Sequence, residues 1–186
     1  KGWSEKKYVP VSDLLEGIKK LIADTDFEQK VGDADTKMNW VVGSICRFIE
    51  AGTRSDEHAF PPESNGDYYS ILRKCFDSIP ADRRYESSSD AYTRAINEPR
   101  GRVIEALIVL TLRRARLAGN DSTAFSHAWT ALRGVIDPIL QKQDENEASL
   151  HAHIGAHYRQ FLFLSKEWLT KNLDLVAPPI SENKVL

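Results

Sequence analysis

NEPRGRVIEALIVLTLRRARLAG, residues 97–119, is the stretch that determines the fold. Pro99 suits the first turn of a helix, where its missing N–H has no intrahelical partner to lose, and Asn97 is expected to cap that helix. Apolar side chains then cover most of the helix circumference, which is typical of a helix packed from several directions. Gly119 suits the position just after a helix end. The stretch therefore predicts a long central helix.

Apolar residues recur at helical spacing on both sides of this stretch, and no segment of useful length alternates with period two. The further predicted helices lie at about 12–23, 36–51, 68–79, 90–96, 122–136, from 148 onward, and around 168–173. Pro138 is expected to end or kink the helix that precedes it. We predict an all-α fold, an antiparallel helical bundle or a fragment of an α-solenoid with about six to eight helices.

The composition is that of a globular domain. The chain has 186 residues, of which 41% are hydrophobic and 28% charged, and its formal net charge is −2. We expect a single domain over residues 1–186, with residues 1–10 and 177–186 as tails or linkers. A chain that begins at Lys1 and leaves through Pro178-Pro179 is expected to be a fragment of a longer protein or a processed product.

Partners and compartment follow from charge, hydropathy and cysteine usage. A net charge near zero argues weakly against nucleic acid and anionic membranes, and no apolar run is long enough to cross a bilayer. Cys46 and Cys75 have no metal-type spacing, so reduced thiols in a cytoplasmic protein are expected, with a disulfide as the alternative. We expect no cofactor.

Histidines form the first candidate site. His153 and His157 stand at i and i+4, which places two imidazoles on one helix face, as in zinc metalloproteases. The residues between them are Ile154-Gly155-Ala156, so the glutamate that serves those enzymes as general base is missing. No third ligand is evident nearby in the sequence. Surface or interhelical histidines are therefore the preferred interpretation, and metal binding is the alternative.

Arginines form the second candidate site. Residues 83–116 hold eight arginines and four acidic residues, a local balance of +4. This region could bind phosphate backbones or an acidic protein partner; alternatively, its arginines neutralise a helix C-terminus and neighbouring acids. The arginines named as interaction candidates are Arg83, Arg84, Arg100, Arg102, Arg113, Arg114 and Arg116.

Catalytic signatures are not found. The sequence has no Gly-rich phosphate loop and no Gly-x-Ser-x-Gly elbow, and neither cysteine has a neighbouring histidine. No carboxylate was identified inside an apolar stripe, where burial would tune its pKa for acid–base work. A non-catalytic module is the preferred interpretation, and an unrecognised helical enzyme is an alternative.

The four tryptophans fall into two groups. Trp40, Trp129 and Trp168 lie on or beside apolar stripes and are expected in the core. Trp3 precedes the first predicted helix, and it becomes an interface candidate if it is exposed.

Two motifs together carry a resemblance. Residues 95–107, AINEPRGRVIEAL, resemble an "Asn-x-Pro-Arg/Lys-Gly-Lys-x-x-Glu-Ala-Leu" helix start. Residues 157–164, HYRQFLFL, with Glu167-Trp168-Leu169, resemble a "Leu-x-x-Leu-Asp-x-x-Trp" ending, although Ser165-Lys166 departs from it. The pair is similar to the helical-repeat regions of large bacterial anti-phage defence proteins, over roughly residues 68–176.

In those defence proteins, a sirtuin-like NADase or a signal-transducing ATPase is attached to a long α-solenoid. The resemblance implies a helical scaffold or sensor that binds a protein partner or neighbouring domains, and it implies no catalytic residue in this segment. A nucleic-acid-binding domain that uses the Arg83–Arg116 region is the first alternative. Binding measured over a salt series separates the two, because phosphate contacts weaken steeply with salt.

Overall fold

The computed structural model describes residues 10–33, 36–56, 59–80, 91–142 and 148–176. These residues form ten α-helices and one 3₁₀ turn, and no strand occurs among them, so the all-α prediction is confirmed. The helices are α1 (Val11–Ile22), α2 (Phe27–Gly32), α3 (Met38–Thr53), α4 (Asn65–Ser78), α5 (Ala91–Asn97), α6 (Pro99–Ala118), α7 (Ser122–Lys142), α8 (Ala148–Ala156), α9 (Tyr158–Lys171) and α10 (Leu173–Val176). The 3₁₀ turn is η2 (Pro62–Ser64). The predicted tails lie outside the described residues, Pro10 excepted.

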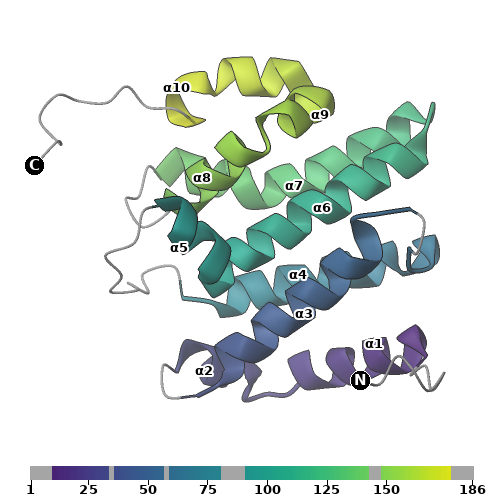
Figure 1. Cartoon of the computed structure of the whole chain (residues 1–186), viewed down its shortest axis with the longest axis vertical. Coiled ribbons are helices and arrows are strands. Elements are labelled where there is room, and N and C mark those ends of the chain that lie inside the picture. The colour runs from purple at the N-terminus through teal and green to yellow at the C-terminus, as the bar shows by residue number, and fades with distance from the viewer. Residues whose placement is uncertain (1–9, 34–35, 57–58, 81–90, 143–147, 177–186) are drawn as a thin grey trace, which may run out of the picture.

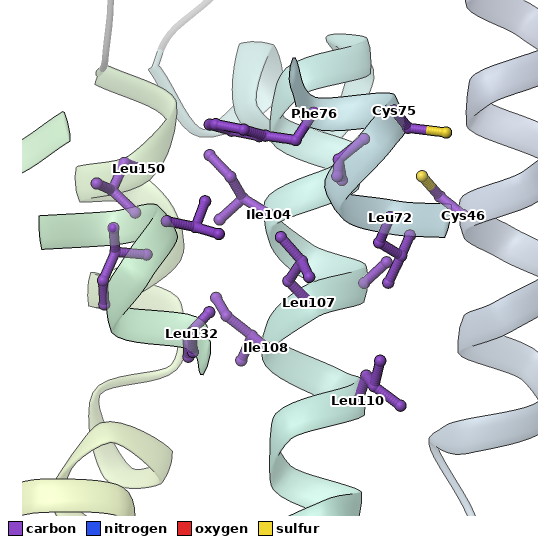
Figure 2. Packing of buried hydrophobic residues seen from close by; sticks show 14 of the residues in the cluster. Cys46, Leu72, Cys75, Phe76, Ile104, Leu107, Ile108, Leu110, Leu132 and Leu150 are labelled. Carbon is purple, nitrogen blue, oxygen red and sulfur yellow. The ribbon is translucent and has the colours of Figure 1, made fainter. Parts of the chain in front are cut away.

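Helix α6 is the centre of the molecule, as predicted. It contacts α3, α4, α5, α7, α8 and α9, and Figure 1 shows it between the α3–α4 layer and the layer of α8 and α9. Its inward side chains, including Ile104, Leu107 and Ile108, are almost fully buried (Figure 2). Helices α1 and α2 close one end of the stack, and α9 and α10 close the other (Figure 1). No helix in the described ranges is long and apolar enough to cross a membrane.

The start of α6 differs from the sequence prediction by one residue. Its N-cap is Glu98, whereas Asn97 ends α5 and donates its side-chain N–H to Thr93 O at 2.8 Å. Asn97 is therefore used by the preceding helix. Gly119 has a φ of 53° after the last turn, so the prediction for the helix end is confirmed.

Helix α7 continues through Pro138 to Lys142, so of the two predicted alternatives, an end or a kink at Pro138, the end was wrong. A proline inside a helix lacks the N–H that would bond the carbonyl four residues earlier. That carbonyl belongs to Gly134, and Nη1 of Arg73 from α4 donates to it at 3.2 Å. The neighbouring helix thus satisfies the acceptor that the proline leaves open.

The C-terminal helices are divided differently from the prediction. The helix expected from residue 148 is broken at His157 into α8 and α9, and Trp168 and Leu169 belong to α9. Ser165 has an extended backbone inside α9, and its Oγ accepts a hydrogen bond from the Trp168 N–H at 3.1 Å. The serine therefore caps the second half of α9. Helix α2 was not predicted because six residues are too few for a periodic pattern.

Two of the three tryptophans that were expected in the core are there. Trp129 and Trp168 are buried and meet edge to face, with ring centroids 5.3 Å apart. Trp40 is 74% exposed near the start of α3, so its assignment to the core was wrong. The Trp40 side chain lies beside the apolar stripe and points into solvent, because no described helix covers that side of α3.

Candidate functional site

The histidine pair spans the junction between α8 and α9. His157 lies between the two helices, and its backbone N–H donates to His153 O at 2.9 Å, so one helical step continues across the break. The two imidazole rings consequently stack, with centroids 6.5 Å apart and planes 22° from parallel. The i, i+4 spacing thus places both imidazoles on one side, as expected, although they do not share one uninterrupted helix.

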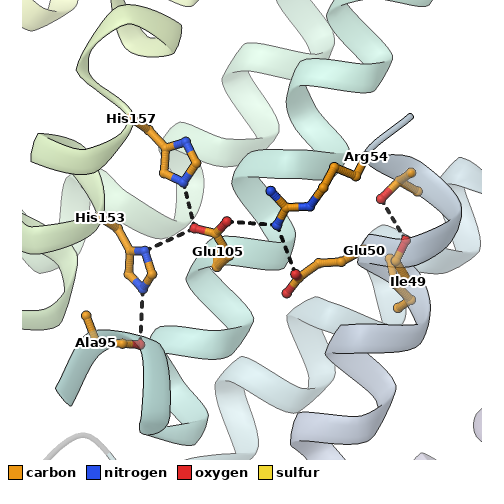
Figure 3. A network of polar contacts seen from close by, with 8 residues as sticks. Ile49, Glu50, Arg54, Ala95, Glu105, His153 and His157 are labelled. Atoms are coloured by element: carbon orange, nitrogen blue, oxygen red, sulfur yellow. Dashed lines mark hydrogen bonds and ion pairs between the residues drawn. The ribbon is translucent and has the colours of Figure 1, made fainter. Parts of the chain in front are cut away.

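Glu105 from α6 lies between the two imidazoles (Figure 3). Its Oε2 is 2.6 Å from His157 Nε2 and 3.2 Å from His153 Nδ1. No third ligand was predicted, because none lies near the histidines in the sequence. In the structure, Glu105 from the distant helix α6 is in the position of a third ligand. Two imidazoles and a carboxylate can together hold a proton or a divalent cation.

A second ion pair joins this cluster to α3. Nη2 of Arg54, just after the end of α3, donates to Glu105 Oε1 and to Glu50 Oε2, at 3.1 Å in each case. Glu105 thus accepts hydrogen bonds on both oxygens, from opposite sides of α6 (Figure 3). The network ties the α3 layer to the α8–α9 layer through the central helix.

The two carboxyl groups respond differently to burial. Burial of Glu105 favours its protonated form, but the hydrogen bonds from His153, His157 and Arg54 outweigh it and hold the pKa of Glu105 well below its usual value. Burial raises the pKa of Glu50, and the hydrogen bond from Arg54 only partly offsets this effect. Oε1 of Glu50 is buried without a hydrogen-bond partner. The network therefore stabilises the ionised form of Glu105, whereas burial opposes ionisation of Glu50.

His153 faces an acceptor on each side of its ring. The side chain is 2% exposed; Nε2 lies 3.2 Å from Ala95 O, and Nδ1 lies 3.2 Å from Glu105 Oε2. Both facing groups can only accept, so an N–H on Nε2 satisfies Ala95 O and an N–H on Nδ1 satisfies Glu105. A neutral imidazole has a single N–H, so one of the two acceptors then faces a lone pair. A second proton on the ring, or a cation between Nδ1 and Glu105, allows both contacts at once.

One of the candidate arginines lies inside the protein. Arg113 is 1% exposed, and its guanidinium donates to Phe60 O and, at 2.9 Å, to Gly52 O near the end of α3. It therefore neutralises the C-terminus of a neighbouring helix from inside the protein. Because it is buried, Arg113 does not qualify as an interaction residue.

Other arginines of the region are held by local partners. Arg116 makes a two-pronged ion pair with Asp56 at 3.1 and 3.2 Å. Arg100 lies 4.0 Å from the centroid of the Phe76 ring, and Arg114 lies 6.0 Å from that of Tyr69. Arg102 lines a pocket beside Glu50. Arg83, Arg84 and Trp3 lie outside the described residues, so their contacts remain predictions.

A groove lies between α6 and α9, beside the histidine cluster. Its volume is about 560 Å³; Val109, Leu112 and Phe163 supply its apolar surface, and Arg54, Arg116 and Arg159 supply charge. Phe163 is 55% exposed, although its ring meets Phe125 edge to face at 5.7 Å. The described side chains that line the groove include no carboxylate. The groove thus combines exposed apolar surface with arginine side chains, of which Arg54 and Arg116 already have carboxylate partners.

No protein-family model matches the chain, and neither a curated protein nor a solved structure matches it.

Glu105 is the functional candidate that sequence reasoning missed. It is the only acidic residue in the run VIEALIVL, residues 103–110, and its side chain is 19% exposed. The statement that no carboxylate lies inside an apolar stripe was therefore wrong. A lone acid within an otherwise apolar run was the available signal, because a buried carboxylate requires a partner. Which partner it meets could not be read from the sequence, since the histidines come from a different layer.

Proposed function

We propose that this chain is a non-catalytic helical scaffold or sensor module that acts through protein–protein contact. The observation that carries the proposal is the α6–α9 groove, with exposed Phe163 beside Val109 and Leu112 and with arginines at its rim. Exposed apolar surface bordered by charge is typical of interaction sites, and both aromatic residues and arginine are enriched where partners bind.

The chemistry of the groove defines the partner. Three arginines line it, and none of its described lining residues is acidic. An apolar side chain from the partner would pack against Phe163 and Leu112, while a flanking carboxylate would meet Arg159. We therefore expect a protein segment that presents an apolar anchor next to acidic residues.

A role in bacterial anti-phage defence is the wider part of the proposal. It rests on the resemblance of residues 95–107 and 157–169 to the helical-repeat regions of defence proteins, in which such modules accompany a separate catalytic effector. The all-α architecture is compatible with a piece of an α-solenoid. In this proposal the chain recognises or holds a protein, and the effector chemistry belongs to another domain.

Selection from a displayed random-peptide library, with the purified chain as bait, tests the groove. We expect the selected peptides to share an apolar residue flanked by Asp or Glu. Phe163→Ser and Arg159→Glu should each weaken binding of a selected peptide at least about tenfold, since truncation of a hot-spot residue costs about 2 kcal/mol or more and about 1.4 kcal/mol is tenfold. Titration of labelled peptide, followed by fluorescence anisotropy, measures the effect.

Trp40→Ser is the matched control. Trp40 is also an exposed aromatic residue, but it belongs to α3 and does not line the groove. Its substitution should leave peptide affinity unchanged. Peptides without a common pattern, or peptides that bind the Phe163 and Trp40 variants equally well, would refute the assignment of the groove.

A further inference from the structure

We propose that Glu105, His153 and His157 form a binding site for a zinc ion. The three donor atoms are Glu105 Oε2, His153 Nδ1 and His157 Nε2, and the three residues can place their donor atoms within 4.8 Å of one another. Two imidazoles and one carboxylate are a donor set that zinc uses at sites with an open coordination position. His157 also lines the proposed interaction groove, but the donor set does not depend on a partner in that groove.

The orientation of His153 is the strongest support. Its Nε2 lies 3.2 Å from the carbonyl oxygen of Ala95, which a hydrogen on that nitrogen satisfies. In that tautomer Nδ1 has a lone pair to donate toward Glu105 Oε2. A ligating histidine almost always donates its other N–H to a carbonyl or carboxylate, as this one does. A metal ion between Nδ1 and Oε2 turns the contact of two lone pairs into two coordinate bonds.

The spacing of the donors requires a small expansion. In a tetrahedral zinc site with bonds of about 2.0 Å, neighbouring donors lie roughly 3.3 Å apart. The distance from His153 Nδ1 to Glu105 Oε2 is already 3.2 Å, whereas that from His157 Nε2 is 2.6 Å. His157 lies at the break between α8 and α9, where its ring is not fixed by a regular helix, and its Nδ1 has no hydrogen-bond partner. The ring of His157 is therefore the one that moves.

A pocket next to the cluster provides the open position. It has a volume of about 340 Å³, and Glu50, Arg54, Arg102 and Gln160 line it together with Glu105, His153 and His157. The formal charges of Glu50 and Glu105 cancel those of Arg54 and Arg102. Little net negative charge is left to attract Mg²⁺ or Ca²⁺, which need several oxygen ligands. Affinity must come from the imidazoles, which suit zinc and its transition-metal neighbours.

Cobalt(II) titration of the full chain, prepared without a polyhistidine tag and treated with a chelator, tests the site. We expect one equivalent of Co²⁺ to give the visible absorption of a four- or five-coordinate ion. Zn²⁺ should displace it, whereas Mg²⁺ and Ca²⁺ should not. Fe²⁺ under anaerobic conditions should displace it poorly, because zinc sites of this kind bind Fe²⁺ less tightly than Co²⁺; efficient displacement by Fe²⁺ would overturn the assignment to zinc.

Glu105→Gln and His157→Asn should each reduce Co²⁺ affinity by roughly 100-fold or more, since even supporting residues around a metal contribute 10- to 100-fold. His127→Asn, which alters an exposed histidine of α7, should leave it unchanged. Far-UV circular dichroism checks that each variant is folded. If either Glu105→Gln or His157→Asn does not fold, the Co²⁺ affinity of the other variant still tests the site. Absence of the absorption band from the wild-type chain would refute the site, as would an equal band in all three variants.

Discussion

At the scale of single residues, the carbonyl oxygen of Ala95 is where three helices meet. It belongs to α5, it accepts a hydrogen bond from His153 at the end of α8, and Gly101 of α6 lies against it. A Cβ atom on Gly101 would clash with that oxygen at 1.9 Å. Because the oxygen belongs to the backbone, no side-chain movement can remove the clash. Gly101 is thus required for the close approach of α5 and α6.

Gly101→Ala should lower the free energy of unfolding by about 1–3 kcal/mol, because the added methyl group forces α5 and α6 apart. Gly43→Ala is the matched control: Gly43 is also helical, but a Cβ there meets nothing within 4 Å. That substitution should raise the free energy of unfolding by about 0.5–1 kcal/mol, through the helix preference of alanine. Urea denaturation measures both. Equal effects of the two substitutions would contradict the contact with Ala95.

Cys46 of α3 and Cys75 of α4 are buried free thiols, labelled on neighbouring helices in Figure 2. Burial raises the pKa of both thiols, that of Cys75 from 9.0 to about 12. Since the thiolate is the nucleophile, Ellman's reagent at pH 8 should react with the native chain at least about tenfold more slowly than with the unfolded chain. Fast reaction of either thiol in the native chain would contradict its burial.

The same thiols make stability depend on pH in the alkaline range. Above about pH 9.0 the unfolded chain loses the Cys75 proton while the folded chain keeps it, so the folded state binds more protons and the free energy of unfolding falls as pH rises. The stabilising contribution is complete below pH 9.0. Cys75→Ala should make this alkaline decline shallower, whatever its effect at neutral pH. An unchanged slope would show that other groups cause the decline.

At the scale of helices, the contact between α4 and α7 allows a proline inside a helix. Arg73 donates to the carbonyl of Gly134, which Pro138 cannot bond. Arg73→Met should therefore destabilise the chain by about 0.5–1.5 kcal/mol, the net value of a typical hydrogen bond. In a Pro138→Ala background the cost should be smaller, because the N–H of the new alanine reaches the same carbonyl. The two substitutions should thus couple.

A double-mutant cycle measures this coupling from the four free energies of unfolding. The Asp77 partner of Arg73 is lost in both backgrounds, so its contribution cancels. Strictly additive effects would mean that the hydrogen bond from Arg73 does not support the proline.

The helices show why some boundaries could be predicted and others could not. The extents of α1, α3 and α6 follow from apolar periodicity and from Pro99 and Gly119, all local features. The continuation of α7 depends on Arg73, which is distant in the sequence, so local rules for proline fail there. The break at His157 likewise leaves the periodic pattern intact, because the helical hydrogen bond to His153 is kept.

At the scale of the whole molecule, the same distinction separates the two candidate sites. The histidine pair is a local pattern and could be found in the sequence, whereas Glu105 joins it only because α6 packs against α8 and α9. For the arginines, clustering along the sequence did not predict which side chains are exposed and unpaired in the fold. The fold turns Arg113 inward and directs Arg116 to Asp56, so a local balance of +4 in the sequence does not become a positive surface of that strength.

This dispersal of charge gives a prediction for nucleic acid binding. With a net charge of −2 and with Arg113 and Arg116 held by internal partners, the chain should bind a labelled DNA duplex or single strand no more tightly than roughly 10⁻⁴ M at physiological salt. Fluorescence anisotropy over a salt series measures this. Each phosphate contact contributes about −0.9 to the slope of log affinity against log salt for duplex DNA, so the slope should correspond to about two contacts or fewer. Micromolar binding with a steep slope that is reduced by Arg83→Gln and Arg84→Gln would instead favour the nucleic-acid alternative, because those two arginines could then supply the charge that the described arginines do not.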